Sequence, residues 1–382
     1  MDFIRILDLK KLVSSGSAFL LGARGVGKSF LIKKQFKNFD QVFIINLLRS
    51  KERLPLEQDP SKLEEIILAS GKSIIIIDEI QKIPPLLDEV HYLIEEYKWV
   101  FLLTGSSARK LKKEGVNLLA HRASMNHMLP LTWYEIYQTK GQFDLISFLQ
   151  LGGIPAITQQ RYLYNYIDTY LKEEILQEAL IRKLTPFSRF LQISSLANGE
   201  IINYSKIGSD AQVPTSTVEQ YYQVLIDTYL GYQLLPWKSP KRKAVSSSKF
   251  YYFDIGICNA LSNISSVESG TVLFGNRFEH FVINEIRAYC LYNKKREEIC
   301  FWRTHDKLEV DVVIEGVCAI EIKSKENVTF RDLKGLKKIH EEANWPHLLV
   351  VSRDTNERID KTGIKFIYWE NFFRKLWKGS FF

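Results

Sequence analysis

A glycine-rich loop constrains this chain more than any other feature. Residues 22–29 read Gly-Ala-Arg-Gly-Val-Gly-Lys-Ser and match the pattern G-x-x-x-x-G-K-[ST] at every fixed position. An apolar run precedes the motif at residues 18–21, and a helix-forming segment follows it at residues 30–36. This order predicts a strand, a phosphate-binding loop and a helix; the alternative is a chance glycine-rich turn before a core helix.

Each position of the loop has an expected role. The glycines let the backbone form a nest of N–H groups around a β-phosphate, and the helix that begins near Lys28 adds its positive N-terminal end. Lys28 is expected to reach the β- and γ-phosphates, and the Ser29 hydroxyl to hold Mg²⁺. The predicted nucleotide-contacting residues of this segment are Gly22, Gly25, Val26, Gly27, Lys28 and Ser29.

Two carboxylates follow a second buried strand. Residues 73–79 form a β-branched run that ends in Asp78 and Glu79, which suits a central parallel strand buried on both faces. Asp78 is placed to hold the water shell of the Mg²⁺ ion, and Glu79 to orient or deprotonate the attacking water. An Asp-Glu pair at a strand end is common on protein surfaces, but after a phosphate loop it indicates nucleotide hydrolysis.

A further strand ends in hydroxyl groups. Residues 99–107 begin as an apolar run and include Thr104 and Ser106 at the end of that run. One of these two hydroxyls is expected to sense the γ-phosphate. The alternative, which stays open, is that they only cap the next helix.

The composition is that of a large globular protein with a basic balance. With 382 residues, 46% of them hydrophobic, the chain can bury a large core in two or three domains. The net charge of +8 is compatible with an anionic partner such as nucleic acid. Charged residues interrupt the N-terminus and no apolar stretch reaches membrane-spanning length, so we expect a cytoplasmic protein without a membrane partner. No C-x-x-C spacing occurs, and reduced core residues are expected at Cys258, Cys290, Cys300 and Cys318.

Strand-like and helical segments alternate through the first third of the chain. The expected strands lie at residues 19–21, 42–46, 73–77, 100–104 and 127–129. Their alternation with helices predicts an α/β fold with a doubly wound parallel sheet and the phosphate loop at a strand's C-terminal end. From residue 131 the pattern becomes helical, interrupted by Gly-Gly-Ile-Pro at residues 152–155, which cannot continue a helix.

Residues 202–232 predict two short helices around a turn. The second helix, capped by Thr215 or Ser216, is expected to direct four residues to the core: Val218, Tyr221, Tyr222 and Leu225. The size and the turn match a helix-turn-helix. The following segment carries five cations and no acid, as a winged-helix hairpin in contact with phosphates would: Lys238, Lys241, Arg242, Lys243 and Lys249. Because the second helix lacks Arg and Lys, a winged helix used only for packing between domains is an equal alternative.

A charged hairpin near the C-terminus carries a second catalytic pattern. A three-residue turn at residues 315–317 would place Asp311 opposite Glu321 and Glu309 opposite Lys323. Carboxylates this close repel one another unless a divalent cation lies between them, and Lys323 is suited to stabilise a hydroxide or the scissile phosphate. Glu279, on an expected helix at 276–285, is a candidate to complete the cluster. The alternative is a solvated charged edge, which apolar residues on the opposite face argue against: Val310, Val312, Ile320 and Ile322.

Together these motifs resemble those of the bacterial and archaeal AAA-type ATPases that carry a winged helix and a C-terminal restriction-endonuclease-like domain of the PD-(D/E)xK type. The resemblance rests on residues 22–29, 77–84, 103–109, 129–135 and 152–155, and segments 248–254, 302–311 and 320–323 extend it over nearly the whole chain. It implies ATP binding by the phosphate loop and Mg²⁺ and water handling by Asp78 and Glu79. The family often has Gly-Arg where this chain has His121-Arg122, and a γ-phosphate-sensing or trans-acting role is implied for Arg122.

The predicted organisation has four parts: a P-loop ATPase core at 1–135, a helical lid at 136–190, a winged helix at 191–265 and a nuclease-like α/β domain at 266–382. The predicted catalytic residues are Lys28, Asp78, Glu79 and Lys323, and the predicted metal ligands are Ser29, Asp78, Glu279, Asp311 and Glu321. The leading hypothesis is an ATPase, a homo-oligomer through its ATPase domain, whose nucleotide state controls engagement and Mg²⁺- or Mn²⁺-dependent cleavage of nucleic acid, DNA in preference to RNA. The alternative is an ATP-gated signalling or scaffold protein that binds a protein partner without cleavage.

Overall fold

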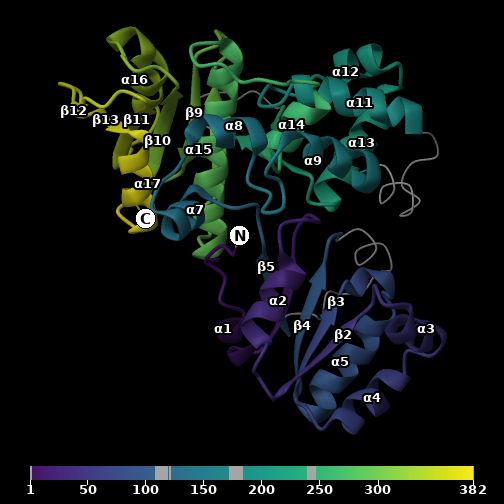
Figure 1. The fold of residues 1–382 in the computed structure, drawn as a ribbon. Helices are drawn as coiled ribbons and strands as arrows, with labels where there is room; N and C mark the ends of the chain where they lie inside the picture. Colours follow the sequence, from purple (N-terminus) through teal and green to yellow (C-terminus); the bar gives the residue numbers. More distant parts are fainter. Residues whose placement is uncertain (1, 108–118, 120–121, 172–183, 239–246, 382) are drawn as a thin grey trace. The chain divides into compact units, whose positions relative to one another are not determined.

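The computed structural model describes residues 2–107, 119, 122–171, 184–238 and 247–381 (Figure 1). Backbone contacts divide the chain into two compact units, one of Met1–Pro130 with Asp227–Leu230 and one of Leu131–Ile226 with Gly231–Phe382. The contacts thus join the predicted lid, winged-helix and nuclease-like regions into one unit. The finer division at residues 135, 190 and 265 stays a prediction.

The first unit is built on a five-stranded sheet in the order β2-β3-β4-β1-β5, in which every neighbouring pair is parallel. The parallel α/β sheet expected from the sequence is confirmed. The fifth strand ends, at His127, where the sequence pattern placed its start. The strands are β1 (Ser17–Leu21), β2 (Val42–Asn46), β3 (Ile74–Asp78), β4 (Val100–Gly105) and β5 (Ala123–His127).

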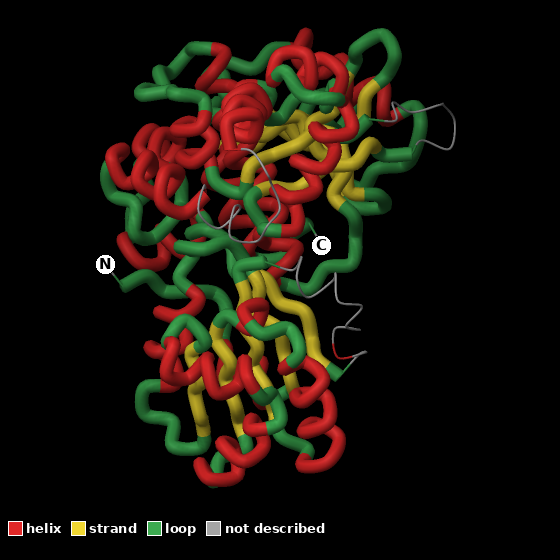
Figure 2. The backbone as a smooth tube through the Cα atoms, turned by 90° about the vertical axis from the view of Figure 1, so that its right-hand side faces the viewer, coloured by secondary structure: helices red, strands yellow, loops and turns green. Residues whose placement is uncertain are grey.

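Helices cover both faces of this sheet (Figure 2). Odd-numbered strand residues such as Phe19 and Ile75 pack in one core with residues of α3, α4 and α5. Their even-numbered neighbours Leu20 and Ile76 are fully buried on the other face, where α1 contacts β1 and β4. Burial on both faces is the reason why these strands are continuous apolar runs. The helices are α1 (Leu9–Ser14), α2 (Lys28–Phe36), α3 (Ser50–Gln58), α4 (Lys62–Ser70), the 3-10 turn η1 (Ile80–Lys82) and α5 (Leu86–Tyr97).

The second unit combines a helical half with an eight-stranded mixed sheet in the order β12-β13-β11-β10-β9-β8-β6-β7. Its strands are β6 (Gly231–Pro236), β7 (Lys249–Tyr252), β8 (Ile299–Arg303), β9 (Glu309–Ile314), β10 (Cys318–Lys323), β11 (His347–Ser352), β12 (Arg358–Ile359) and β13 (Lys365–Tyr368). The hairpin β6–β7 belongs to this sheet because β6 also pairs in parallel with β8.

The helices of this unit include one long element, α15, which carries much of the apolar core. They are α7 (Trp133–Lys140), α8 (Leu145–Leu151), α9 (Gln160–Asn165), the π-helical η3 (Tyr166–Leu171), α11 (Leu184–Leu196), α12 (Tyr204–Ala211), α13 (Thr215–Asp227), α14 (Ile255–Leu261), α15 (Val272–Tyr292), η4 (Phe330–Leu333), α16 (Lys334–His340) and α17 (Trp369–Trp377). None of the described helices is long and apolar enough to cross a bilayer. The expectation of core cysteines is confirmed, since all four are free and buried.

The two helices expected around a turn are α12 and α13, and the four residues predicted to face the core are buried. Ile201, shortly before α12, forms an isolated antiparallel bridge with Lys249 at the start of β7. The hairpin β6–β7 follows α13. The region therefore runs as helix α11, bridge, helices α12 and α13, and hairpin.

Two sequence motifs, residues 129–135 and 152–155, are fixed by hydrogen bonds to buried carboxylates of the second unit. Thr132 forms a capping box with Glu135 at the start of α7, and the buried carboxylate of Glu285 accepts hydrogen bonds from the N–H groups of Trp133 (2.8 Å) and Tyr134 (3.2 Å) and from the indole of Trp377 (2.7 Å). These bonds satisfy the first N–H groups of α7 with a side chain of α15. Burial nevertheless raises the pKa of Glu285 to about 7.

The segment 152–155 is held in a similar way. Asp254 caps α14 by accepting from the N–H of Ile257 (3.0 Å), and its other oxygen accepts from the N–H of Gly153 (2.7 Å). A Cβ on Gly152 would lie 2.2 Å from the Asp254 carboxylate, so the close approach requires glycine there.

Candidate active sites

The phosphate-binding loop connects β1 to α2. Gly25 and Gly27 adopt left-handed backbone conformations with φ of +82° and +101°, and α2 begins directly afterwards at Lys28. Glycine adopts these angles without a steric penalty, which explains why the motif needs it. The Lys28 side chain is buried, and its ammonium donates to the carbonyls of Gly22 (2.6 Å) and Ala23 (3.1 Å). The Lys28 side chain is therefore folded back onto the loop that is expected to bind the phosphates of a nucleotide.

Asp78 lies within reach of the loop because β4 alone separates β3 from β1 in the sheet. Its carboxylate accepts hydrogen bonds from the hydroxyls of Ser29 (2.8 Å) and Thr104 (2.5 Å). The Thr104 hydroxyl also accepts from the N–H of Glu79 (3.2 Å). A hydroxyl and a carboxylate in contact are a hard oxygen donor set, so Ser29 and Asp78 fit a Mg²⁺ ion.

Glu79 is held by two residues of neighbouring elements. Its backbone is left-handed, with φ of +65°, and the 3-10 turn that follows brings the Gln81 side chain back to the Glu79 carboxylate. Ser106 donates to the same carboxylate (3.0 Å) and accepts from Gln81 (3.0 Å). A Cβ on Gly105 would lie 2.8 Å from the Gln81 amide oxygen, so this contact uses the glycine at the end of β4.

Gln81 is a site residue that the sequence motifs did not reveal. The only signal is its position two residues after Glu79, which becomes informative once the 3-10 turn is known. Thr104 and Ser106 each contact one of the two carboxylates, Asp78 and Glu79 respectively. The alternative that they cap a following helix concerns residues 108–118, outside the described part of the chain.

Arg122 lies at the opposite end of the sheet from the phosphate loop. It precedes Ala123, which is paired with Ser17 at the start of β1, whereas the loop follows the last residue of β1. Four residue steps of strand, about 13 Å, separate the two ends. The Arg122 guanidinium forms an ion pair with Glu95. This position does not bring Arg122 to the phosphate loop of its own chain, and both the γ-phosphate-sensing role and the trans-acting role stay predictions.

The second candidate site is centred on a buried lysine of the second unit, Lys249. Its ammonium lies 2.5 Å from the carboxylate of Glu309 and 3.4 Å from that of Glu279, and the side chain is 4% exposed. Tyr251, two residues along β7, donates its hydroxyl to Glu279 (2.7 Å). Arg303 bonds the other oxygen of Glu309 (2.9 Å). The hairpin β6–β7 thus contributes a lysine and a tyrosine to an acidic cluster on α15 and β9.

This position corrects one expectation. Lys249 was predicted to join the loop cations that contact phosphates, but it is the first residue of β7 and its side chain is buried against acids. Lys238 is exposed. The other three cations of that segment, Lys241, Arg242 and Lys243, lie outside the described residues.

The predicted hairpin forms with its three-residue turn, since Ile314 pairs with Cys318 and Val312 with Ile320. Beyond Val312 the strand is irregular. Between the pairs Cys300–Val313 and Trp302–Val310, one residue of β8 opposes two of β9, which places Asp311 in a β-bulge.

The bulge changes the predicted arrangement of charges. The regular ladder between β9 and β10 ends at Val312, and the Asp311 carboxylate accepts from the N–H of Ile322 (2.7 Å) in place of a backbone bond. Glu309 is directed to Lys249 and Arg303. The expected pairing of Glu309 with Lys323 is therefore not formed.

Asp311, Glu321 and Lys323 shift one another's pKa values, and the charge of Glu279 contributes to each of these shifts. Burial raises the pKa of Asp311 to about 7; Glu279 adds to this shift, and Lys323 and Lys249 oppose it. Burial, then Asp311, also raises the pKa of Glu321, although its carboxylate lies 2.5 Å from the Lys323 ammonium. The structure thus brings the four predicted residues near one another and adds Lys249 to them.

The donor set fits a divalent cation in part. The Oε2 atom of Glu321 is buried and has no hydrogen-bond partner in the described structure, so a carboxylate oxygen is left for a ligand. However, no three acidic, histidine or cysteine side chains in the described ranges are grouped as a ready set of metal ligands. Lysine ammonium groups neutralise these acids instead.

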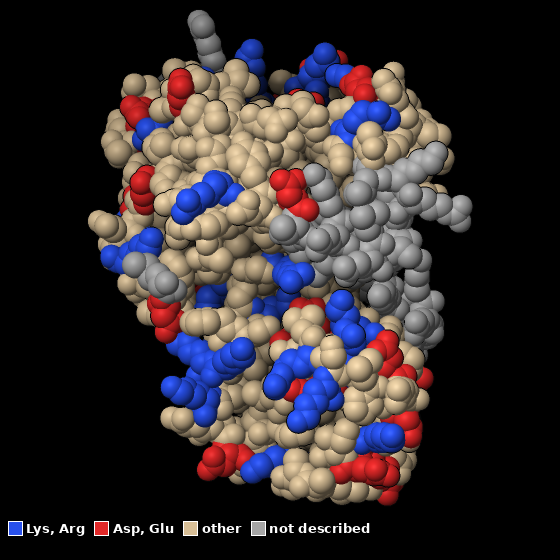
Figure 3. Space-filling view, turned by 45° about the vertical axis from the view of Figure 1, so that its right-hand side comes forward, with Lys and Arg blue, Asp and Glu red and all other residues tan. Residues whose placement is uncertain are grey.

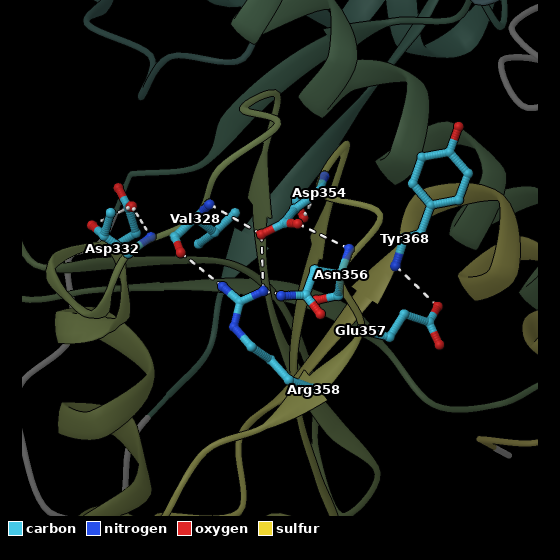
Figure 4. A network of polar contacts seen from close by, with 9 residues as sticks. Val328, Asp332, Asp354, Asn356, Glu357, Arg358 and Tyr368 are labelled. Atoms are coloured by element: carbon cyan, nitrogen blue, oxygen red, sulfur yellow. Dashed lines mark hydrogen bonds and ion pairs between the residues drawn. The ribbon is translucent and has the colours of Figure 1, made fainter.

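A polar network fixes the chain that leaves this site after Lys323 (Figure 4). Asp354 accepts from the N–H of Val328 (3.3 Å), and Arg358 donates to the Val328 carbonyl (2.8 Å) while bonding Asp354 (2.9 Å). The segment between β10 and η4 is therefore clamped to the end of β11, which supports the position of Lys323 at the end of its strand.

A large polar cavity opens beside the lysine. Its volume is about 1030 Å³, and Lys249, Glu279 and Glu309 form part of its wall. The remaining lining comes from residues 199–205 with Thr215 and Glu219, from Ser247, and from residues 303–305 with Lys307. The cavity therefore gives the acidic cluster a route to solvent between the α12–α13 region and the β8–β9 connection.

Comparison with protein families separates the chain into three matched stretches. Residues 14–137 match the AAA domain. Residues 145–268 and 274–372 match two domains of unknown function, DUF8612 and DUF4143. The stretch that matches the AAA domain contains the parallel sheet, the phosphate loop and the Asp78–Glu79 pair of the first unit.

Similar proteins extend over most of the chain. The uncharacterized protein MJ1544 of Methanocaldococcus jannaschii is 25% identical over 80% of this chain and 74% of its own length. An uncharacterized protein of Haemophilus influenzae is 22% identical over 75% of this chain and 74% of its own.

Two solved structures are also similar. One is the replication initiator DnaA bound to AMPPCP and single-stranded DNA, at a TM-score of 0.30 and 12% identity, covering 57% of this chain and 84% of DnaA. The other is the Aeropyrum pernix ORC1 protein in complex with DNA, at a TM-score of 0.26 and 11% identity, covering 67% of this chain and 90% of that protein. Scores this low support no argument from either structure.

Proposed function

We propose that the first unit hydrolyses ATP with Mg²⁺, and that its nucleotide state controls how the second unit engages nucleic acid, DNA in preference to RNA. The observation that carries the first part is the hydrogen-bonded set around Asp78 and Glu79. Thr104 of β4 orients Asp78, Ser106 directly after β4 orients Glu79, and Asp78 also bonds the serine of the phosphate loop.

In this proposal each group has one task. Loop N–H groups and Lys28 bind the phosphates, and Ser29 and Asp78 hold Mg²⁺, which neutralises charge on the phosphates when bound. Glu79 accepts a proton from the attacking water. Gln81 and Ser106 hold the Glu79 carboxylate in one orientation, so the side chain loses little conformational entropy when the attacking water binds.

The nucleic-acid part rests on charge and on the order of elements in the second unit. The order of α11, bridge, α12, α13 and hairpin supports a winged helix, which would place a reading helix and a loop beside a nucleic acid. Figure 3 shows Lys and Arg side chains gathered on part of the surface of the first unit, where α1 and α2 carry exposed lysines. Such surfaces attract phosphate backbones without sequence preference.

The acidic cluster is the candidate site for phosphodiester cleavage in a nuclease-like domain. Asp311 and Glu321, with Glu279, would hold Mg²⁺ or Mn²⁺, and the metal would supply an activated water and charge neutralisation. Lys323 is placed beside Glu321 and would face the scissile phosphate.

A second function is favoured by two other observations. The acids of the cluster are already neutralised by Lys249 and Lys323, and α13, the expected reading helix, has no Lys or Arg. Both features suit a protein in which the second unit binds a protein partner without cleavage. ATP would then gate that contact.

The ATP part is tested by hydrolysis and binding assays on three variants. Lys28→Ala should lose nucleotide binding, whereas Glu79→Gln should retain binding and lose turnover by roughly 10²–10⁴-fold, because only the proton acceptor is removed. Lys34→Ala is the matched control, since this exposed lysine on α2 pairs with Asp2. Unchanged turnover in Glu79→Gln would remove that residue from the mechanism.

The nucleic-acid part needs a separate assay. Binding and Mg²⁺- or Mn²⁺-dependent cleavage would be measured on single-stranded, duplex and branched DNA and RNA, with Asp311→Asn and Lys323→Ala beside the unmodified protein. Cleavage lost in both variants while ATP hydrolysis persists would support the nuclease site. Binding to none of the substrates would favour the protein partner.

A further inference from the structure

A small cavity in the second unit shares no lining residue with either candidate site. Its volume is about 220 Å³, and its walls come from β6, the second half of α15 and the chain that leads into β8. At ~30 Å³ per water, this is room for roughly seven waters. The apolar part of the lining consists of Leu234, Ile283, Cys290, Leu291 and Ile299, and the charged part consists of Arg287, Lys295 and Glu297.

Arg287 is the unusual group in this cavity. Its guanidinium lies over the ring of Tyr232, 4.2 Å from the centroid, and Asn284 holds the Tyr232 hydroxyl (2.7 Å). Within the described ranges, no residue accepts a hydrogen bond from this guanidinium or pairs with it as an acid. Burial lowers the pKa of Arg287, although the side chain stays partly exposed.

The Arg287 side chain is half-buried, carries five N–H donors and stays protonated. A cation–π contact uses the face of the guanidinium and leaves its N–H edge without an acceptor. None of its nitrogens is among the buried polar atoms that lack a partner in the described structure, so this edge is accessible to a ligand in the cavity.

We propose that this cavity binds a small organic anion, a carboxylate with a short apolar group, through the N–H edge of Arg287. The planar fork of arginine matches a carboxylate with two parallel hydrogen bonds. The lining carries one net positive charge, from two cations, Arg287 and Lys295, and one acid, Glu297. This charge suits a monoanion. The aliphatic wall would contact the apolar group.

The test uses the full-length protein with benzoate and butyrate as probes and inorganic phosphate as an anion without an apolar part. Calorimetric titration and thermal unfolding should show saturable binding of the carboxylates, with phosphate weaker. Arg287→Met keeps an unbranched stem over Tyr232 and removes the charge. It should fold with an unchanged or higher Tm without anion and bind benzoate at least about tenfold more weakly.

Two further variants make the outcome decisive. Arg296→Met removes the same charge from an exposed position outside the lining and should bind benzoate like the unmodified protein. Leu291→Trp fills the cavity without changing its charge and should also abolish binding. The proposal is overturned if benzoate does not bind the unmodified protein, if it binds Arg287→Met or Leu291→Trp equally well, or if only water occupies the cavity in a structure grown with benzoate.

Discussion

The two candidate sites differ in the groups that bond their buried acids: neutral donors at the first site and cations at the second. At the phosphate loop, Asp78 and Glu79 are held by neutral groups, the hydroxyls of Ser29, Thr104 and Ser106 and the amide of Gln81. At the β9–β10 hairpin, the acids are held by cations, Lys249 against Glu279 and Glu309, and Lys323 against Glu321.

The difference has a physical consequence. Hydroxyls and amides orient a carboxylate without cancelling its charge, so the first site keeps a negative charge for a metal and for a water proton. Ammonium groups cancel the charge, so a divalent cation at the second site would compete with lysines already present. The first arrangement is therefore ready for chemistry with one bound nucleotide, whereas the second must rearrange its ion pairs before it can hold a metal.

The largest expected effect comes from breaking the lysine-held cluster. Lys249→Met leaves Glu279 and Glu309 without their shared cation and should lower the free energy of unfolding by roughly 3–5 kcal/mol. Urea unfolding of the full-length protein measures this, with the exposed Lys238→Met as control. Added Mn²⁺ should restore part of the loss if the freed acids bind metal. An unchanged midpoint would show that the ion pairs contribute nothing to the fold.

A second prediction concerns pH and the anchor between α7 and α15. Burial places the pKa of Glu285 at about 7, above its ordinary value of 4.5, so the folded protein binds an extra proton between these values. Its stability should then fall as pH rises through that window. Glu285→Gln does not titrate, so its free energy of unfolding relative to the unmodified protein should rise over the same range.

Urea unfolding at about pH 4.5, 6 and 7.5 measures this difference. Glu268→Gln, an exposed acid of the same unit, is the control and should show a constant difference. A constant difference for Glu285→Gln as well would mean that the hydrogen bonds from Trp133, Tyr134 and Trp377 offset the effect of burial on this carboxylate.

The smallest expected effect tests the neutral clamp on Glu79. Gln81→Ala removes one donor but leaves Ser106 in place, so turnover should fall about tenfold, or ~1.4 kcal/mol, with nucleotide affinity unchanged. Steady-state hydrolysis and equilibrium nucleotide binding separate the two quantities. An equal loss in Lys82→Ala, the next residue of the same turn, would show that the turn matters and not the amide of Gln81.

Local patterns in the sequence were enough to predict which residues lie together at the first candidate site. The phosphate loop, the β-branched strand and the hydroxyls at the end of β4 each lie within a few consecutive residues, and parallel strands bring their C-terminal ends to one edge of the sheet. Gln81 was missed because its role depends on the left-handed backbone of Glu79, which a short motif does not specify.

The sequence by itself determined the parallel sheet, the glycine-dependent loop and the three-residue turn of the charged hairpin, because each follows from residue spacing and backbone preference over short range. Tertiary structure alone decided the rest. A bulge in β9 moved Glu309 away from Lys323, and the pairing of β6 with β8 brought Lys249 to the acids of α15 and β9. Such contacts join residues far apart in the chain, and the cost of burying each charge depends on the partner that the fold supplies.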